Sequence, residues 1–162
     1  MRSGVEVEAQ VVASTDDVWA GWRCDGAHVA IGVARGGKDQ MVTWGALLAG
    51  IGVVLGAFAA HGLADRLEPV KLESFRTGVH YQMLHALALL LVAALARGDL
   101  VAAAGARVAS ICFLLGVLFF SGSLYGLALG GPRWLGPVTP IGGTFFIAGW
   151  AALLWASLAR PG

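Results

Sequence analysis

The stretch that decides the fold is residues 42–60, which read VTWGALLAGIGVVLGAFAA, contain no charged side chain and are followed by His61. A helix needs about 20 mostly apolar residues to cross the roughly 30 Å hydrocarbon core of a bilayer. Inside lipid, the backbone N–H and C=O groups must bond within the segment, and this run lacks the alternation of a barrel strand. We therefore predict that residues 42–60 form a transmembrane helix.

Three more apolar runs follow along the chain. The uncharged part of the second, residues 81–96, is too short to cross a bilayer at about 1.5 Å per residue, so this span must begin near Thr77. The expected fold class is all-α, an integral membrane four-helix bundle with spans at about 42–60, 77–96, 108–130 and 141–158.

The composition agrees with lipid as the main solvent. The 162 residues are 57% hydrophobic and 13% charged, whereas soluble domains are about 45–50% apolar and about 25% charged. The net charge of +1 gives no reason to expect a nucleic-acid partner. Cys24 and Cys112 lie far apart and indicate neither a disulfide framework nor a metal site.

Residues 1–40 form a separate region with four basic and six acidic side chains. Glu6 and Glu8 stand where a secretory signal would be basic, and no unbroken apolar segment follows them. The plainer interpretation is a disordered tail that precedes a membrane domain at 41–162. We favour a sharper hypothesis, that translation starts at Met41, because residues 35–38, RGGK, can be written in purine-rich codons that resemble a ribosome-binding site. Mass spectrometry of the native N-terminus would test it.

The connection between the first two spans, residues 65–80, has helical apolar spacing. Asp65 and Glu68 have the spacing of an acidic capping pair, and Pro69 suits the first turn of a helix. Three apolar residues share one face, namely Leu72, Phe75 and Val79. The pattern predicts a short amphipathic helix at the membrane interface that runs into the second span. A solvated loop is the less favoured alternative.

Small residues recur at every fourth position in two spans. They are Gly52, Gly56 and Ala60 in the first span, and Gly122, Gly126 and Gly130 in the third. Such stripes let helix backbones approach closely in lipid. We predict packing between spans of the same chain, with a dimer interface as the alternative.

Polar side chains are expected to gather at one face of the membrane, because successive spans alternate in direction. We refer to them as the polar cluster and treat them as candidate binding residues: His61, Glu73, Arg76, Tyr81, Gln82, His85, Ser121, Ser123, Tyr125, Arg133, Trp134 and Thr139. Polar groups within a bilayer are costly and usually face the protein interior or a cavity.

His85 is the deepest of these residues in its span. It could bind a ligand, carry a proton or ligate a metal, but we favour a structural role in which it bonds to Tyr125 or a serine. His61, His80 and His85 have no HxxxH, CxxC or carboxylate pattern, so neither a metal nor a haem is predicted.

No catalytic residues and no cofactor are predicted. Ser121 and Ser123 have no paired base and acid, and the Gly142–Gly143 pair is not followed by the lysine of a phosphate loop.

Four motifs in order carry a family resemblance: GAFAAHGL at 56–63, FRTGVHYQMLHALALL at 75–90, FSGSLY at 120–125 and RWLGPVTPIGG at 133–143. Together they resemble the YgdD-like family of small bacterial inner-membrane proteins, which has animal transmembrane relatives, over residues 41–158. Ala59, His80 and Leu84 depart from residues common in that family. The resemblance implies a multi-pass protein of the inner (plasma) membrane and no activity, because the function of the family is unknown.

Three classes of function remain open. The first is a non-enzymatic membrane protein that acts through contacts with lipid or a partner protein. The second is a small transporter or channel subunit with Tyr81, Gln82 and His85 along a polar path, which would have to oligomerise. The third and least favoured is a membrane enzyme. The expected partners are the lipid bilayer, a membrane protein or a second copy of the chain.

The Lys and Arg counts near the spans predict orientation only narrowly. The face with the first and third loops has four, namely Arg66, Lys71, Arg76 and Arg133, and the other face has three, namely Arg97, Arg107 and Arg160. A chain that starts at Met41 is therefore expected to place the first loop in the cytoplasm. Arg35 and Lys38 of a longer chain would reverse this bias, and dual insertion is an alternative.

Overall fold

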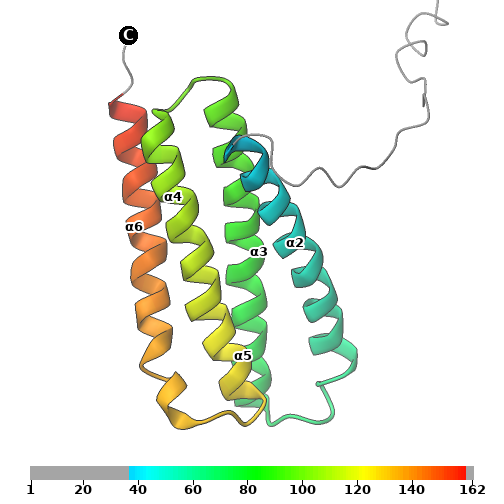
Figure 1. The fold of residues 1–162 in the computed structure, drawn as a ribbon. Helices are drawn as coiled ribbons and strands as arrows, with labels where there is room; N and C mark the ends of the chain where they lie inside the picture. The colour runs from blue at the N-terminus through cyan, green and yellow to red at the C-terminus, as the bar shows by residue number, and fades with distance from the viewer. Residues whose placement is uncertain (1–36, 160–162) are drawn as a thin grey trace, which may run out of the picture. The chain divides into compact units, whose positions relative to one another are not determined.

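The computed structural model describes residues 37–159, and every element of regular structure in that range is helical. The main helices are α2 (Gly37–His61), α3 (Pro69–Arg97), α4 (Ala103–Gly116), α5 (Gly122–Ala128) and α6 (Val138–Leu158) (Figure 1). A π-helical segment, Val117–Ser121, joins α4 to α5, and a 3-10 turn, Arg133–Leu135, precedes α6.

Four helical segments of the described range are long and apolar enough to cross a membrane. They are Asp39–His61, Pro69–Arg97, Ala103–Ala128 and Arg133–Leu158. The predicted all-α fold with four spans is thus confirmed. The tail predicted at residues 1–40 lies outside the described residues up to position 36, and α2 begins upstream of Met41.

The predicted amphipathic connector is the first part of α3. Pro69 occupies the first turn as expected, and the helix can continue through Arg97 because it contains no later proline and only one glycine, Gly78. Glu68 is the N-cap but makes no side-chain capping bond, so the predicted capping pair with Asp65 is wrong.

The apolar face of this connector packs against protein. Leu72 and Phe75 are buried with Ala59 and Leu63 from the end of α2, and Tyr125 of α5 packs against the same cluster. Burial against neighbouring helices removes the apolar stripe from lipid and fixes the start of α3 in the helical domain.

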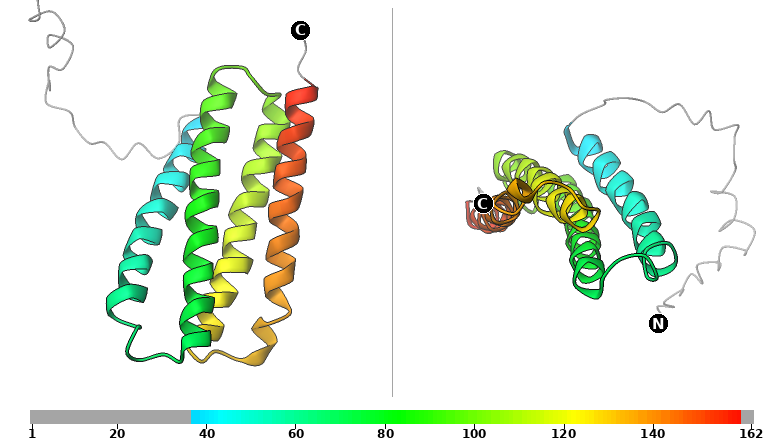
Figure 2. Two further views of the ribbon diagram at one scale, coloured as in Figure 1. Left: turned by 180° about the vertical axis from the view of Figure 1, so that it is seen from behind. Right: turned by 90° about the horizontal axis from the view of Figure 1, so that it is seen from below.

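The four spans are unequally packed. α3 lies in the middle: α2 packs mainly against it, while α4 and α6 pack against each other and α4 and α5 also contact α3 (Figure 2). Within the spans, 44% of the α3 window is buried but only 17% of the α2 window. The first span is therefore an edge helix with most of its surface free to face lipid.

Close helix contacts depend on glycines, but only partly on the predicted ones. A Cβ on Gly52 would lie 2.5 Å from Met83 Sδ and one on Gly56 would lie 3.6 Å from Val79, so these two glycines face α3, as predicted for packing within the chain.

The stripe predicted in the third span makes one close contact, to the turn that precedes α6. Gly122 faces open space, Gly126 faces Leu135 of that turn, and Gly130 follows the end of α5 with a φ of +89°. The α4–α6 contact depends instead on glycines such as Gly149, where a Cβ would lie 2.6 Å from the Phe113 ring. The spacing rule missed this contact because its glycines belong to two different helices.

Candidate functional site

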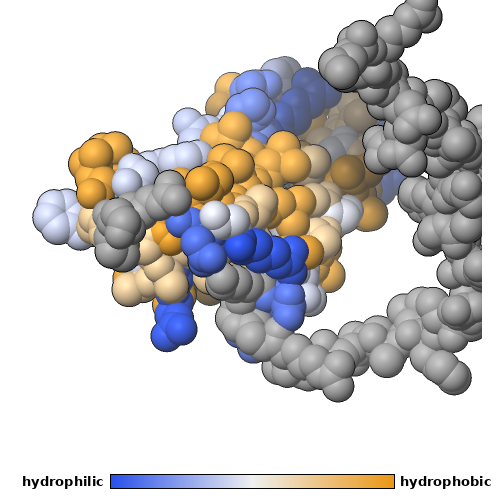
Figure 3. Space-filling view, turned by 90° about the horizontal axis from the view of Figure 1, so that it is seen from above, coloured by the Kyte–Doolittle hydropathy of each residue, from blue (hydrophilic) through white to orange (hydrophobic). Residues whose placement is uncertain are grey.

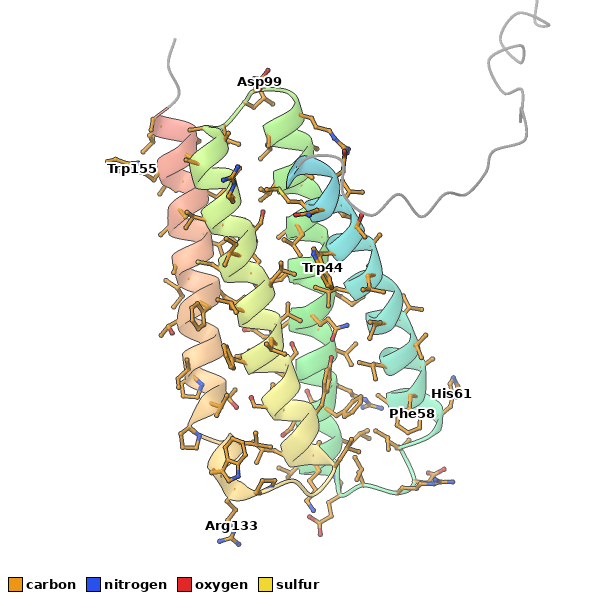
Figure 4. All side chains as sticks on the ribbon, viewed as in Figure 1. Trp44, Phe58, His61, Asp99, Arg133 and Trp155 are labelled. Carbon is orange, nitrogen blue, oxygen red and sulfur yellow. The ribbon has the colours of Figure 1, made fainter. Side chains whose placement is uncertain are left out.

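The structure brings the predicted polar cluster to one end of the helices. The end of α2, the start of α3, the end of α5 and the start of α6 meet there, and Figure 4 shows His61 and Arg133 at this end and Asp99 and Trp155 at the other. Within that end, the twelve residues separate by depth into a buried part and an exposed part.

Gln82 is the centre of the buried part. Its Nε2 donates a hydrogen bond of 2.8 Å to the backbone oxygen of Leu48 in α2. Its Oε1 accepts a bond of 2.9 Å from the Tyr125 hydroxyl in α5. Only 3% of the Gln82 surface is exposed, and both ends of its amide are used to link three helices.

A second link joins α5 to the start of α6. The Ser123 hydroxyl donates to the Phe120 backbone oxygen at 2.9 Å and lies 2.7 Å from Thr139 Oγ1. A serine hydroxyl has one hydrogen. Since that hydrogen is used on Phe120, Thr139 is the donor in the Ser123–Thr139 bond.

His85 bonds to its own helix, which corrects the prediction that it bonds to Tyr125 or a serine. Its Nδ1 lies 2.8 Å from the Tyr81 backbone oxygen. A carbonyl can only accept, so Nδ1 carries the proton. Tyr125 lies near Phe75, Gly78 and Gln82, which are closer than His85 to the end of α3 that holds the polar cluster. This difference in depth prevents the expected bond.

The surroundings of His85 are aromatic. Its ring stacks on Phe146 of α6, with centroids 3.5 Å apart and planes 9° apart, and Phe113 of α4 lies at 5.3 Å. The exposed edge of this group is Tyr81, which contacts Phe120 at 4.6 Å. Among the described residues, the buried His85 Nε2 and Ser121 Oγ have no hydrogen-bond partner.

The exposed part contains His61, Glu73, Arg76, Arg133 and Trp134. Within residues 37–159, none of these side chains makes an ion pair or a hydrogen bond to protein. The same range contains no group of three metal-ligating side chains, and His61, His80 and His85 do not converge.

A shallow groove of about 610 Å³ lies beside the exposed part of the polar cluster. It is lined by Pro69, Val70, Glu73, Ser74, Thr77 and Leu124. Val70 is 78% exposed there. The sequence indicated Glu73 but not the groove, because its formation depends on how α5 lies against the first turns of α3.

The opposite end of the helices holds features that the sequence analysis missed. Arg97 donates to Asp39 at 2.6 Å across the α3 and α2 ends. A separate cleft there includes Arg107 and Ser110 of α4 together with Trp44 of α2. Trp44 was recognisable as an aromatic residue near a span end, but no sequence spacing relates it to α4.

Comparison with known proteins identifies the family. A family model described as a protein of unknown function, DUF423, matches residues 55–143. A UPF0382 membrane protein of Haemophilus influenzae is 44% identical over 120 residues, which cover 74% of this chain and 94% of the relative. The chain belongs to this family.

Other family members agree over a similar extent. The UPF0382 inner membrane protein YgdD of Escherichia coli is 40% identical over 70% of this chain and 86% of its own length. YwdK of Bacillus subtilis is 41% identical over 70% of this chain and 92% of its own length. No solved structure matches the chain.

Membership of the family confirms the resemblance carried by the four sequence motifs. The relatives are named membrane or inner membrane proteins, and the chain has four helices able to span. It is therefore a multi-pass protein of the inner (plasma) membrane. The family description indicates no catalytic function.

Proposed function

We propose that this protein is a non-enzymatic membrane protein that binds a partner protein at the face formed by the α2–α3 and α5–α6 connections. The observation that carries the proposal is the exposed part of the polar cluster. Its charged side chains of both signs have no protein partner in the described range, and they lie beside the groove of α3 and α5.

The groove has the mixed chemistry of a protein interface. Val70 and Pro69 offer apolar surface, Glu73 offers a carboxylate, and Trp134, 67% exposed, lies at the same end of the molecule. Tryptophan and arginine are enriched at protein interfaces. Charges of both signs also favour a partner of complementary pattern over a uniformly anionic lipid surface.

The buried part of the polar cluster supports the non-enzymatic part of the proposal. The Gln82 amide, the Tyr125 hydroxyl and the Ser123 hydroxyl are used in bonds between or within helices. Within residues 37–159 neither Ser121 nor Ser123 bonds to a histidine or a carboxylate, so the serine–base pairing of a hydrolase is not assembled there.

A transporter or channel subunit is the second candidate, but no specific observation favours it. Its polar path would need Tyr81, Gln82 and His85 to line open space. Gln82 and His85 are instead 3% and 2% exposed. Proton or solute flux into vesicles that contain the wild-type protein, together with loss of that flux in a His85→Ala variant, would support a transporter or channel instead.

Photocrosslinking in native membranes tests the proposal. A benzophenone amino acid at Val70 should give one reproducible crosslinked protein. The same probe at Ile147, which is 71% exposed on α6, serves as the lipid-facing control and should give lipid adducts only. Glu73→Lys should remove the Val70 product, because it inverts the charge in the groove. Equal, lipid-only products from both positions would refute partner binding at this face.

A further inference from the structure

A second surface feature lies at the end of the helices opposite the polar cluster. It is a cleft of about 220 Å³ between α2, α3 and α4, lined by Gln40, Met41, Trp44, Leu89, Arg107, Ser110, Ile111 and Leu114. Gly45 lets α2 approach α3 closely, because a Cβ there would lie 3.0 Å from the Ala86 oxygen. Since α2 packs mainly on α3, the cleft stays open between α2 and α4.

Polarity changes along the cleft in the direction of the membrane normal. Arg107 lies two turns before Leu114 in α4, a rise of about 10 Å at 1.5 Å per residue. Deeper along α4 than Arg107, the walls are apolar at Ile111 and Leu114, apart from the hydroxyl of Ser110, and Leu89 of α3 adds to the apolar wall. Figure 3, which views this end from above, shows hydrophilic and hydrophobic residues side by side on it. The cleft is thus charged near the membrane surface and apolar toward the bilayer centre.

Arg107 is the exposed cation of this cleft. It makes no ion pair or hydrogen bond within residues 37–159. Arg97 at the same end differs, because Asp39 neutralises its charge. A guanidinium presents paired N–H donors that match the oxygens of a phosphate. Trp44 is 48% exposed at the same site, and Figure 4 shows it in the half of the molecule that contains Asp99.

We propose that this cleft binds an anionic phospholipid, with its phosphate on Arg107 and one acyl chain along Met41, Leu89 and Leu114. Charge complementarity selects the headgroup, and the apolar walls select the chain. The α2 and α4 residues that line the cleft, from Met41 onward, lie within segments able to span the membrane. Lipid molecules therefore surround this site. The volume of about 220 Å³ is below the roughly 300–1,000 Å³ of pockets for whole drug-sized ligands, so the cleft would hold the phosphate and the first part of one acyl chain.

This proposal is independent of partner binding at the opposite face, and lipid retention tests it directly. The full chain is purified in mild detergent and titrated with phosphatidylglycerol or with phosphatidylcholine of identical chains, with binding read by native mass spectrometry. Phosphatidylglycerol should bind more tightly. Arg107→Gln should weaken its binding about three- to tenfold, because a charge-assisted contact is lost at a partly exposed site. Arg97→Gln, an arginine at the same end whose charge is paired with Asp39 and which does not line the cleft, is the matched control and should leave the binding of phosphatidylglycerol unchanged.

A second pair of variants tests the acyl-chain part. Ile111→Trp should fill the cleft and weaken binding of both lipids. Val108→Trp, at a residue of α4 with the same 51% exposure that does not line the cleft, should have no effect. Equal binding of the two lipids, an equal effect of Arg107→Gln and Arg97→Gln, or full binding by Ile111→Trp would each overturn the proposal. Displacement of the lipid by inorganic phosphate alone would also overturn it, since the chain would then contribute nothing.

Discussion

The buried and exposed parts of the polar cluster differ in residue type, since only the exposed part has Glu and Arg side chains, and in what those residues contact. Gln82, Ser123 and Tyr125 bond across helices. Glu73 and Arg76, a short distance along the same α3 helix, have no protein partner in the described range. A polar residue in a membrane sequence can therefore be assigned a structural or a binding role only when its depth along the helix is known.

Depth determines the difference because water is absent from the hydrocarbon core. A polar side chain there needs a protein partner, because otherwise no hydrogen bond offsets the free-energy cost of its desolvation. At the helix ends, water can satisfy the same groups, so they remain available to other molecules. We therefore expect stability to depend on the buried part and recognition to depend on the exposed part.

Gln82→Leu should have the largest effect on stability. The substitution removes the bond to Leu48 and leaves the Tyr125 hydroxyl without its acceptor. A buried group left unpaired costs about 1–3 kcal/mol in proteins, although hydrogen bonds in membranes average nearer 0.6 kcal/mol. With two bonds lost, we expect a decrease of about 1–2 kcal/mol in unfolding free energy, measured by denaturation in mixed micelles.

A double-mutant cycle with Tyr125→Phe separates the bond from packing. If the buried bond matters, Tyr125→Phe should be costly in the wild-type background and nearly neutral once Gln82 is replaced. Additive effects of the two substitutions would show that the hydroxyl and the amide do not act together.

His85→Leu should have a smaller effect, and a larger one than His80→Leu. His85 loses its stacking on Phe146 and its bond to Tyr81, and aromatic contacts of this kind contribute about 0.5–1.5 kcal/mol. His80 is exposed and should be nearly neutral. Thermal unfolding of both variants in detergent gives the comparison, and equal melting temperatures would contradict it.

The sequence predicted the four spans because long uncharged runs leave helix as the available structure in lipid. It predicted the shared face of the polar cluster because spans alternate in direction. It also predicted that Gly52 and Gly56 pack within the chain. Each of these conclusions depends only on the order of the spans along the chain or on the spacing of residues within one helix.

The partners of individual side chains could not be predicted in the same way. His85 was expected to bond to Tyr125 or a serine, yet Tyr125 bonds to Gln82, because the relative depth of α3 and α5 is set by loop lengths and packing. The cleft around Arg107 and the edge position of α2 likewise depend on which helices pack together. Sequence spacing within one helix contains no information on that choice.

The Asp39–Arg97 pair sharpens the comparison between buried and exposed polar residues, because its two side chains are exposed and yet bonded to each other. Their side chains are 54% and 50% exposed, so the pair should contribute only about 0.2–1 kcal/mol and less at high salt. Arg97→Gln should lower stability by that amount in the chain with residues 1–40. In a chain that starts at Met41, which lacks Asp39, the same substitution should be neutral. A salt-independent loss in both forms would exclude the pair as its cause.

Arg76→Gln and Arg133→Gln should have the smallest effect on stability and a clear effect on binding. Both arginines are exposed and unpaired in the described range, and surface substitutions of this kind usually change unfolding free energy by no more than about 0.5 kcal/mol. The double variant should therefore unfold like the wild type in detergent, while the protein crosslink from a probe at Val70 should weaken. Gln82→Leu, measured in parallel under conditions where it remains folded, should show the reverse: lower stability with the crosslink retained. If the arginine substitutions destabilise the protein as much as Gln82→Leu does, depth does not separate the two roles, and the division of the polar cluster into a structural and a binding part is wrong.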